Sequence, residues 1–169
     1  MDFKDKTVLI TGASSGIGKE TAIQFAKKGS NVILIARRRQ KLEQIADDLK
    51  KYNISTLVCE CDVSDKSQVE KMSKLVLEKY GSIDILVNNA GFAIYGSVSD
   101  LTTEEIESQM ATNYFGMIYC IKNFLPSMLE KKSGHIVNVA SVAASFGLPG
   151  IASYCASKFA MLGFSEGLK

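Results

Sequence analysis

Short runs of apolar, β-branched residues alternate along the chain with longer stretches in which apolar residues recur every three or four positions. Runs of the first kind predict strands buried on both faces, and stretches of the second kind predict amphipathic helices. This alternation favours right-handed crossovers and an α/β fold with a doubly wound parallel sheet. The predicted strands cover residues 6–11, 31–35, 55–61, 83–87 and 135–140.

Signals for helix ends lie between these predicted strands. A long helix is expected from Thr102 to about residue 131, with an interruption at Gly116 and a kink at Pro126. The last helix follows the turn at 149–150. Two pairs of residues predict capping boxes at helix starts, Asp65 with Gln68 and Thr102 with Glu105.

Composition and charge are those of an ordinary globular protein. The 169 residues predict one domain, 1–169, and 46% of them are apolar. A net charge of +2 indicates no broad basic surface, so nucleic acid is not an expected partner. The charged start of the chain argues against a secretory signal. The longest uncharged stretch, 135–157, contains Pro149 and Gly150, which favours a strand and a turn over a membrane span.

The chain has four cysteines, one histidine and no Cys-x-x-Cys motif. Cys59 and Cys61 fall on one face of a predicted strand, so both are interpreted as small core residues and not as metal ligands. His135 has no partner at ligand spacing and is also interpreted as structural. No metal site is predicted, and the free cysteines indicate a reducing, cytoplasmic setting.

A glycine-rich turn, Gly12 to Gly18, follows the first predicted strand and opens the first helix. This context is required of a dinucleotide-binding loop. Gly12 would allow the tight turn, Gly16 a close approach of the backbone to pyrophosphate, and Gly18 close packing of helix on strand. The free N–H groups and the dipole of the helix would face the phosphates. The spacing differs from the commoner Gly-x-Gly-x-x-Gly, and an ordinary strand–helix turn is the alternative.

The second predicted strand ends at Ala36-Arg37-Arg38-Arg39, where an NAD-binding site would place an acid. An arginine would instead bind a ribose 2′-phosphate through two hydrogen bonds. Arg37 therefore favours NADP(H) over NAD(H). The alternative, a solvated basic start of a helix, applies more to Arg38 and Arg39.

Polar or small residues follow the carboxyl ends of the predicted strands, and parallel sheets bind ligands beyond that edge. Tyr154 and Lys158 are four residues apart on the last helix and would share a face. A lysine there would favour the tyrosinate form, and such a phenol can transfer a proton to or from a substrate oxygen. Alone, this spacing and Asn113 within a helix are also typical of solvated positions. The residues at the sheet edge are Gly12, Asp62, Asn88 and Ser141.

Six motifs resemble, in order and spacing, those of the short-chain dehydrogenase/reductase family. The resemblance covers the entire chain and implies a single Rossmann-like domain. The motifs are Thr11 to Gly18, Asp62-Val63, Asn88-Asn89-Ala90-Gly91, Asn113, Ser141 and Tyr154-x-x-x-Lys158.

The resemblance assigns a catalytic role to four residues. Tyr154 would be the general acid in reduction and the base in oxidation. Lys158 would promote its ionisation and bind the nicotinamide ribose. Ser141 would hold and polarise the substrate carbonyl, and Asn113 would position a water in a proton relay.

The same resemblance implies cofactor contacts. Asp62 would bind the adenine amino group, with Val63 packed on the ring. The implied ribose contacts are Asn88, Ala90 and Gly91. The residues that would line the phosphate turn are Gly12, Ser14, Ser15, Gly16, Ile17 and Gly18. Ala36-Arg37 resembles the branch of the family that prefers NADP(H).

Members of the family usually continue through further strands, so this chain is expected to be the N-terminal part of a longer one. If these 169 residues were the whole protein, the fifth strand would be an unpaired edge, which soluble proteins normally cover. The predicted activity is an NADP(H)-dependent carbonyl reductase or alcohol dehydrogenase; the alternative is a cofactor-binding regulatory module without turnover. Apolar residues at 92–95 and 142–148 favour a hydrophobic substrate. The family also implies a homodimer or homotetramer.

Overall fold

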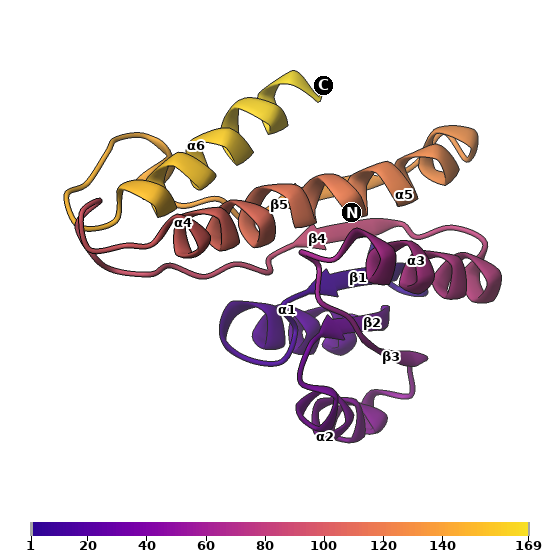
Figure 1. Ribbon diagram of the computed structural model, residues 1–169. Helices are drawn as coiled ribbons and strands as arrows, with labels where there is room; N and C mark the ends of the chain where they lie inside the picture. Colours follow the sequence, from indigo (N-terminus) through magenta and orange to yellow (C-terminus); the bar gives the residue numbers. More distant parts are fainter. Residues whose placement is uncertain (1, 169) are drawn as a thin grey trace.

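The computed structural model describes residues 2–168 and contains one five-stranded sheet in the order β3-β2-β1-β4-β5 (Figure 1). All of its strand pairs are parallel. Since the strand order reverses beside β1, the prediction of a doubly wound, Rossmann-like sheet is confirmed. The strands are β1 (Thr7–Thr11), β2 (Asn31–Ala36), β3 (Thr56–Glu60), β4 (Ile85–Asn88) and β5 (His135–Asn138).

Helices connect these strands and cover both faces of the sheet. They are α1 (Gly16–Lys27), α2 (Arg39–Leu49), α3 (Lys66–Tyr80), α4 (Thr103–Met110), α5 (Gly116–Glu130) and α6 (Ala152–Gly167). A π-helical turn, η2 (Ala111–Phe115), joins α4 to α5, and short 3-10 turns occur at η1 (Lys50–Tyr52) and η3 (Val142–Ala144). Within residues 2–168, no helix is both long and apolar enough to span a membrane.

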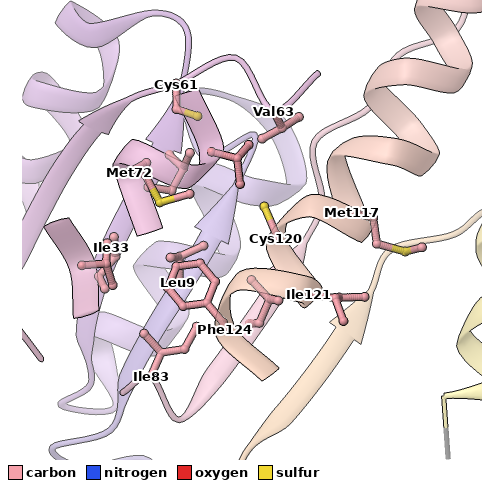
Figure 2. Packing of buried hydrophobic residues seen from close by; sticks show 14 of the residues in the cluster. Leu9, Ile33, Cys61, Val63, Met72, Ile83, Met117, Cys120, Ile121 and Phe124 are labelled. Carbon is pink, nitrogen blue, oxygen red and sulfur yellow. The ribbon is translucent and has the colours of Figure 1, made fainter. Parts of the chain in front are cut away.

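The period of two along each strand divides the core into two clusters. On one face of β1, Leu9 packs with residues of α3 and α5, including Met72 and Phe124 (Figure 2). On the other face, Val8 and Ile10 pack with residues of α1 and α2. The central strand β1 is therefore buried on both sides, as its continuous apolar run predicts.

The long helix predicted from Thr102 is interrupted by η2 and not at Gly116 itself, which is the first residue of α5. Gly116 has a different role, because a Cβ atom there would lie 2.8 Å from Cγ2 of Val63. The glycine therefore allows α5 to approach the loop that follows β3. Pro126 lies inside α5.

The two predicted capping boxes have different outcomes. At Thr102 both reciprocal bonds with Glu105 are present. Asp65 caps α3 by accepting from the N–H groups of Ser67 and Gln68, but the reciprocal bond is absent in the described structure. Gln68 Oε1 instead accepts from the N–H of Asp62 at 2.9 Å. This bond links the start of α3 to a predicted cofactor residue.

Strand β5 lies at the edge of the sheet and ends at Asn138, two residues before the predicted end. Its exposure alternates, and Val137 is 46% exposed. The prediction of a buried strand is therefore wrong for β5 in this chain. The two residues beyond β5, Val139 and Ala140, belong to the wall of the cleft described below.

Candidate active site at the carboxyl edge of the sheet

A cleft of about 800 Å³ opens beyond the carboxyl ends of the strands. It is the place where a doubly wound sheet binds its ligand. Thirteen of the predicted site residues line it, namely Gly12, Ser14, Ser15, Gly16, Ile17, Arg37, Asp62, Val63, Ala90, Gly91, Ser141, Tyr154 and Lys158. Residues from the turns after all five strands and from α6 therefore meet in one cavity.

Three predicted site residues, Gly18, Asn88 and Asn113, lie behind the wall of this cleft. A Cβ atom on Gly18 would lie 2.5 Å from the backbone oxygen of Gly12, so this glycine allows α1 to pack closely on the turn. Asn88 is buried, and its Nδ2 donates to Oδ1 of Asn138 across β4 and β5 at 2.9 Å. Asn113 is fully buried as well.

The glycine turn has the backbone conformation that its sequence predicts. Gly12 and Gly16 have φ angles of +67° and +54°, in the left-handed region that favours glycine. A Cβ atom on Gly12 would lie 2.9 Å from Cα of Ala90, whereas nothing lies within 4 Å of one on Gly16. The backbone at Gly16 is therefore open to a ligand, and α1 begins there with its N–H groups free of a side-chain cap from Ser15.

Hydrogen bonds join the glycine turn to the loop that follows β4. Thr11 Oγ1 accepts from the N–H groups of Asn89 and Ala90, each at 3.0 Å. Asn89 Nδ2 in turn donates to the backbone oxygen of Thr11 at 3.0 Å. These bonds hold the glycine turn against the loop after β4, and residues of both line the cleft. Asn89, which the sequence analysis did not assign to the site, lines the cleft.

Two arginines from the turn after β2 lie at one end of the cleft. Arg38 Nη2 donates to Oγ of Ser14 at 2.7 Å and to Oγ of Ser15 at 2.8 Å. Arg37 Nη1 lies 3.6 Å from Oδ2 of Asp62. The interpretation of Arg38 as a solvated side chain therefore missed these contacts.

The strand and helix boundaries in the structure distinguish Arg38 from Arg39. Because β2 ends at Ala36 and α2 begins at Arg39, residues 37 and 38 both lie in the turn at the carboxyl edge. Arg39 is the one that fits the alternative interpretation, since its Nε pairs with Glu43 along the helix at 2.8 Å.

Asp62 lies in the loop after β3 and is fixed in place by hydrogen bonds from Ser64. Its Oδ1 accepts from the N–H and the hydroxyl of Ser64, at 3.0 and 2.7 Å. Val63 follows it as a buried apolar residue in the wall. Asp62 and Val63 thus place a carboxylate beside an apolar surface. A nucleotide base could stack on the valine and donate a hydrogen bond to the carboxylate.

Tyr154 and Lys158 lie on α6 and line the same cleft as Ser141. Lys158 Nζ lies 5.8 Å from the centroid of the Tyr154 ring and donates to the backbone oxygen of Val139 at 2.9 Å. Burial lowers the pKa of Lys158 from its usual 10.5 to about 8. Ser141 Oγ accepts from the N–H of Ala143 at 3.1 Å, which leaves its own proton available to a ligand.

Asn113 uses its side chain to join two parts of the site. Its Oδ1 accepts from the N–H of Phe92, and its Nδ2 donates to the oxygen of Phe92 and to Oγ of Ser157, each at 2.9 Å. Both amide hydrogens are thus engaged within the protein. Gly91 allows this approach, because a Cβ atom there would lie 2.9 Å from Asn113 Oδ1 and 3.5 Å from Lys158 Nζ.

The cysteines do not provide a nucleophile for the cleft. All four are free and buried, as expected of small core residues. Cys61 lines the cleft, but burial raises the pKa of its thiol to about 12. Among residues 2–168 no group of three or more His, Cys, Asp or Glu side chains is placed to hold a metal ion.

Comparison with known proteins gives consistent matches over the whole chain. The model of the short chain dehydrogenase family matches residues 6–169. An uncharacterized oxidoreductase of Listeria monocytogenes is 38% identical over 169 residues, covering 100% of this chain and 68% of that protein. The 3-ketodihydrosphingosine reductase of Bos taurus is 40% identical over 167 residues, covering 96% of this chain and 50% of that protein.

Solved structures show the same fold. An alcohol dehydrogenase from the archaeon Thermococcus sibiricus, complexed with 5-hydroxy-NADP, matches with a TM-score of 0.93 and 31% identity, covering 98% of this chain and 70% of that one. An NAD+-bound xylitol dehydrogenase matches with a TM-score of 0.94 and 30% identity, covering 99% and 65%. The chain thus spans between 50% and 68% of the length of the two relatives described above.

Proposed function

Because this chain belongs to the short-chain dehydrogenase/reductase family, we propose that it transfers a hydride between NADP(H) and a carbonyl or secondary alcohol. The observation that carries the proposal is the meeting of Ser141, Tyr154 and Lys158 in the cleft that the glycine turn also lines. A glycine with open space beside it, a free helix start and two arginines fit a dinucleotide phosphate.

In the proposed reaction Ser141, Tyr154 and Lys158 have separate roles. When bound, the nicotinamide cofactor supplies or accepts the hydride. In reduction, the hydroxyl groups of Ser141 and Tyr154 donate hydrogen bonds to the substrate oxygen and stabilise the negative charge that develops there. Tyr154 then transfers its proton to that oxygen, and the positive charge of Lys158 favours the tyrosinate that remains. Oxidation uses the same groups in reverse.

The cofactor preference rests on Arg37 and Arg38. Both guanidinium groups line the end of the cleft beyond β2, where an acid would repel a 2′-phosphate. Ser14 and Ser15, which Arg38 already contacts, would add hydroxyl donors to the same phosphate. This arrangement supports NADP(H) over NAD(H).

The walls of the remaining cleft support a hydrophobic substrate. Phe92, Tyr95, Val142 and Leu148 line it, and Tyr95 and Val142 are each 80% exposed. The bovine relative is named for reducing a ketone, 3-ketodihydrosphingosine. A hydrophobic ketone is therefore the proposed substrate class.

We also propose that the protein is a homodimer or homotetramer in a reducing, cytoplasmic compartment. Phe115, in η2, and Phe159, on α6, are aromatic side chains that are 44% and 43% exposed, and a second copy could cover them. The four free cysteines suit a reducing compartment. Light scattering after gel filtration would give the mass, and a monomer at micromolar concentration would contradict the oligomer.

Turnover is tested by following NADPH absorbance with a panel of aliphatic, aromatic and steroid-like ketones. We expect reduction by the parent, and a loss of at least about 100-fold in kcat for Tyr154→Phe, because the general acid is removed. Tyr52→Phe, on η1 and outside the cleft, is the matched control and keeps its activity. Activity that survived Tyr154→Phe would contradict the mechanism, and cofactor binding without turnover would favour the regulatory module.

The arginines are tested by the ratio of NADH to NADPH dissociation constants. We expect the parent to bind NADPH more tightly, and Arg37→Asp and Arg38→Ala each to weaken NADPH binding by about tenfold or more, since a charge-assisted bond contributes about 1.5–3 kcal/mol. Arg39→Ala is the control, because Arg39 pairs with Glu43. Equal affinities of the parent for the two cofactors would refute the proposed preference.

A further inference from the structure

A buried glutamine lies one helical turn before Asn113. Gln109, on α4, has no exposed surface, although glutamine is mostly an exposed residue type. Its Oε1 accepts from the N–H of Ile94 at 3.0 Å, and its Nε2 donates to Oγ of Ser153 at 2.8 Å. Nε2 also lies 3.3 Å from the oxygen of Glu105. The whole amide is thus engaged, as a buried polar group requires.

Gln109 and Asn113 make the same kind of bridge. Each amide binds the backbone of the loop after β4, at Ile94 or Phe92, and a serine of α6. The two amides are four residues apart, and so are the two serines, Ser153 and Ser157. Residues at this spacing share a helix face. The loop and α6 are therefore joined by two parallel amide bridges.

The serines that these bridges reach are next to the proposed catalytic residues in the sequence. Ser153 precedes Tyr154, and Ser157 precedes Lys158. Ile151 at the N-cap of α6 provides no side-chain hydrogen bond, and the N–H of Gly96 donates to the oxygen of Gly150 at 2.9 Å just before the helix. The amide bridges thus add side-chain bonds to this backbone contact between the loop and the start of α6. On the other side of the bridge, residues of the same loop, Phe92, Ala93 and Tyr95, line the cleft.

We propose that Gln109 is a positioning residue for catalysis, which sets the place of Tyr154 relative to the loop 92–95 through Ser153 and Ile94. Gln109 does not line the cleft, so it acts through these two partners and touches no reacting atom. The inference rests on the proposed function. A displacement of about 1 Å at a reacting group can lower a rate by about 100-fold, which is why such a bridge matters.

The test compares Gln109→Leu with Asn123→Leu. Leucine fills similar space but cannot form the bridge, and Asn123 is an amide on α5 whose Nδ2 donates to the oxygen of Tyr119, outside the site. We expect Gln109→Leu to lower kcat by about tenfold or more, with NADPH affinity changed less than twofold. Asn123→Leu should keep the kcat of the parent. A loss of kcat and of cofactor affinity in equal measure would indicate general damage and overturn the inference.

The milder variant Ser153→Ala removes only the other end of the bridge. If Gln109 acts through Ser153, the double variant loses less than the product of the two single losses, because both remove one interaction. Independent losses that multiply would overturn the inference. If Gln109→Leu folds poorly, Ser153→Ala is measured alone, and a kcat equal to that of the parent then overturns the inference.

Hydrogen exchange provides a readout that needs no turnover. The N–H of Ile94 should exchange faster in Gln109→Leu and at the parent rate in Asn123→Leu. Unchanged exchange at Ile94 overturns the inference. A parent that reduces none of the ketones overturns the proposed function and the inference with it, whereas an active parent whose kcat is unchanged in Gln109→Leu overturns the inference alone.

Discussion

Lys158 places an ammonium group in the protein interior with two uncharged partners, the backbone oxygen of Val139 and the thioether sulfur of Met161. Burial without a neighbouring carboxylate disfavours the charged form, and the lowered pKa of Lys158 reflects this. At neutral pH the burial of this charge therefore disfavours the folded state. Its presence is better explained by the cleft that it lines together with Tyr154, where the proposed function gives its positive charge a role.

The pH dependence of stability should reveal this burial when the parent is compared with Lys158→Met. Below pH 8 the lysine is protonated in the folded and unfolded states alike. Between about 8 and 10.5 the folded protein releases the proton while the unfolded chain still holds it, so the parent gains stability relative to the variant as pH rises. Urea unfolding at several pH values measures the difference. Parallel curves for parent and variant would contradict a buried lysine with a lowered pKa.

At the scale of single elements, glycines in two helices illustrate how neighbours decide the role of one residue type. Gly18 in α1 lies against the backbone of Gly12 and the side chain of Asn89. Gly163 in α6 has nothing within 4 Å of a Cβ position. Both glycines lie within a helix, so the difference between them is the presence or absence of neighbouring atoms at the Cβ position.

Alanine substitutions at these positions should have opposite effects on the free energy of unfolding. Gly163→Ala should raise it by up to about 1 kcal/mol, because alanine favours a helix over glycine. Gly18→Ala should lower it by about 1–3 kcal/mol, because α1 must move away from the glycine turn. Gly18→Ala should also weaken NADPH binding. Chemical denaturation and cofactor titration measure both, and a Gly18→Ala variant as stable as the parent would contradict the close packing.

At the scale of the whole molecule, the cleft collects residues from every strand end and from α6. These segments are far apart in the chain, from the glycine turn at residue 12 to Lys158 on α6. A cofactor bound there would contact most elements of the fold at once. Binding should therefore stabilise the entire domain and not a single loop.

NADPH at about 100 times its dissociation constant should stabilise the protein by about 2.7 kcal/mol, which corresponds to a rise in Tm of about 5–10 °C for a domain of this size. A thermal shift assay measures this without any substrate. Arg38→Ala should reduce the shift at the same NADPH concentration. No shift at millimolar NADPH would contradict a cofactor site in the cleft.

Much of this protein follows from local spacing in its sequence. The strands, the cap at Thr102, the glycine turn and the four-residue step from Tyr154 to Lys158 each depend on residues a few positions apart. Steric and hydrogen-bonding preferences act over that range whatever the rest of the chain does. For this reason the fold class and the glycine turn could be predicted from local patterns, whereas the roles of Asn113, Ser141 and Tyr154 were implied by the resemblance to the family.

The tertiary structure decided which side chains from segments distant in the sequence contact one another. Arg38 meets Ser14 from 24 positions away, and Gln109 meets Ser153 from 44. Whether a polar side chain faces solvent or a buried partner depends on how helices and loops pack against one another, and no local pattern contains that information. The packed structure alone therefore shows that Arg38 contacts the glycine turn and that a buried glutamine bonds to the helix that carries Tyr154.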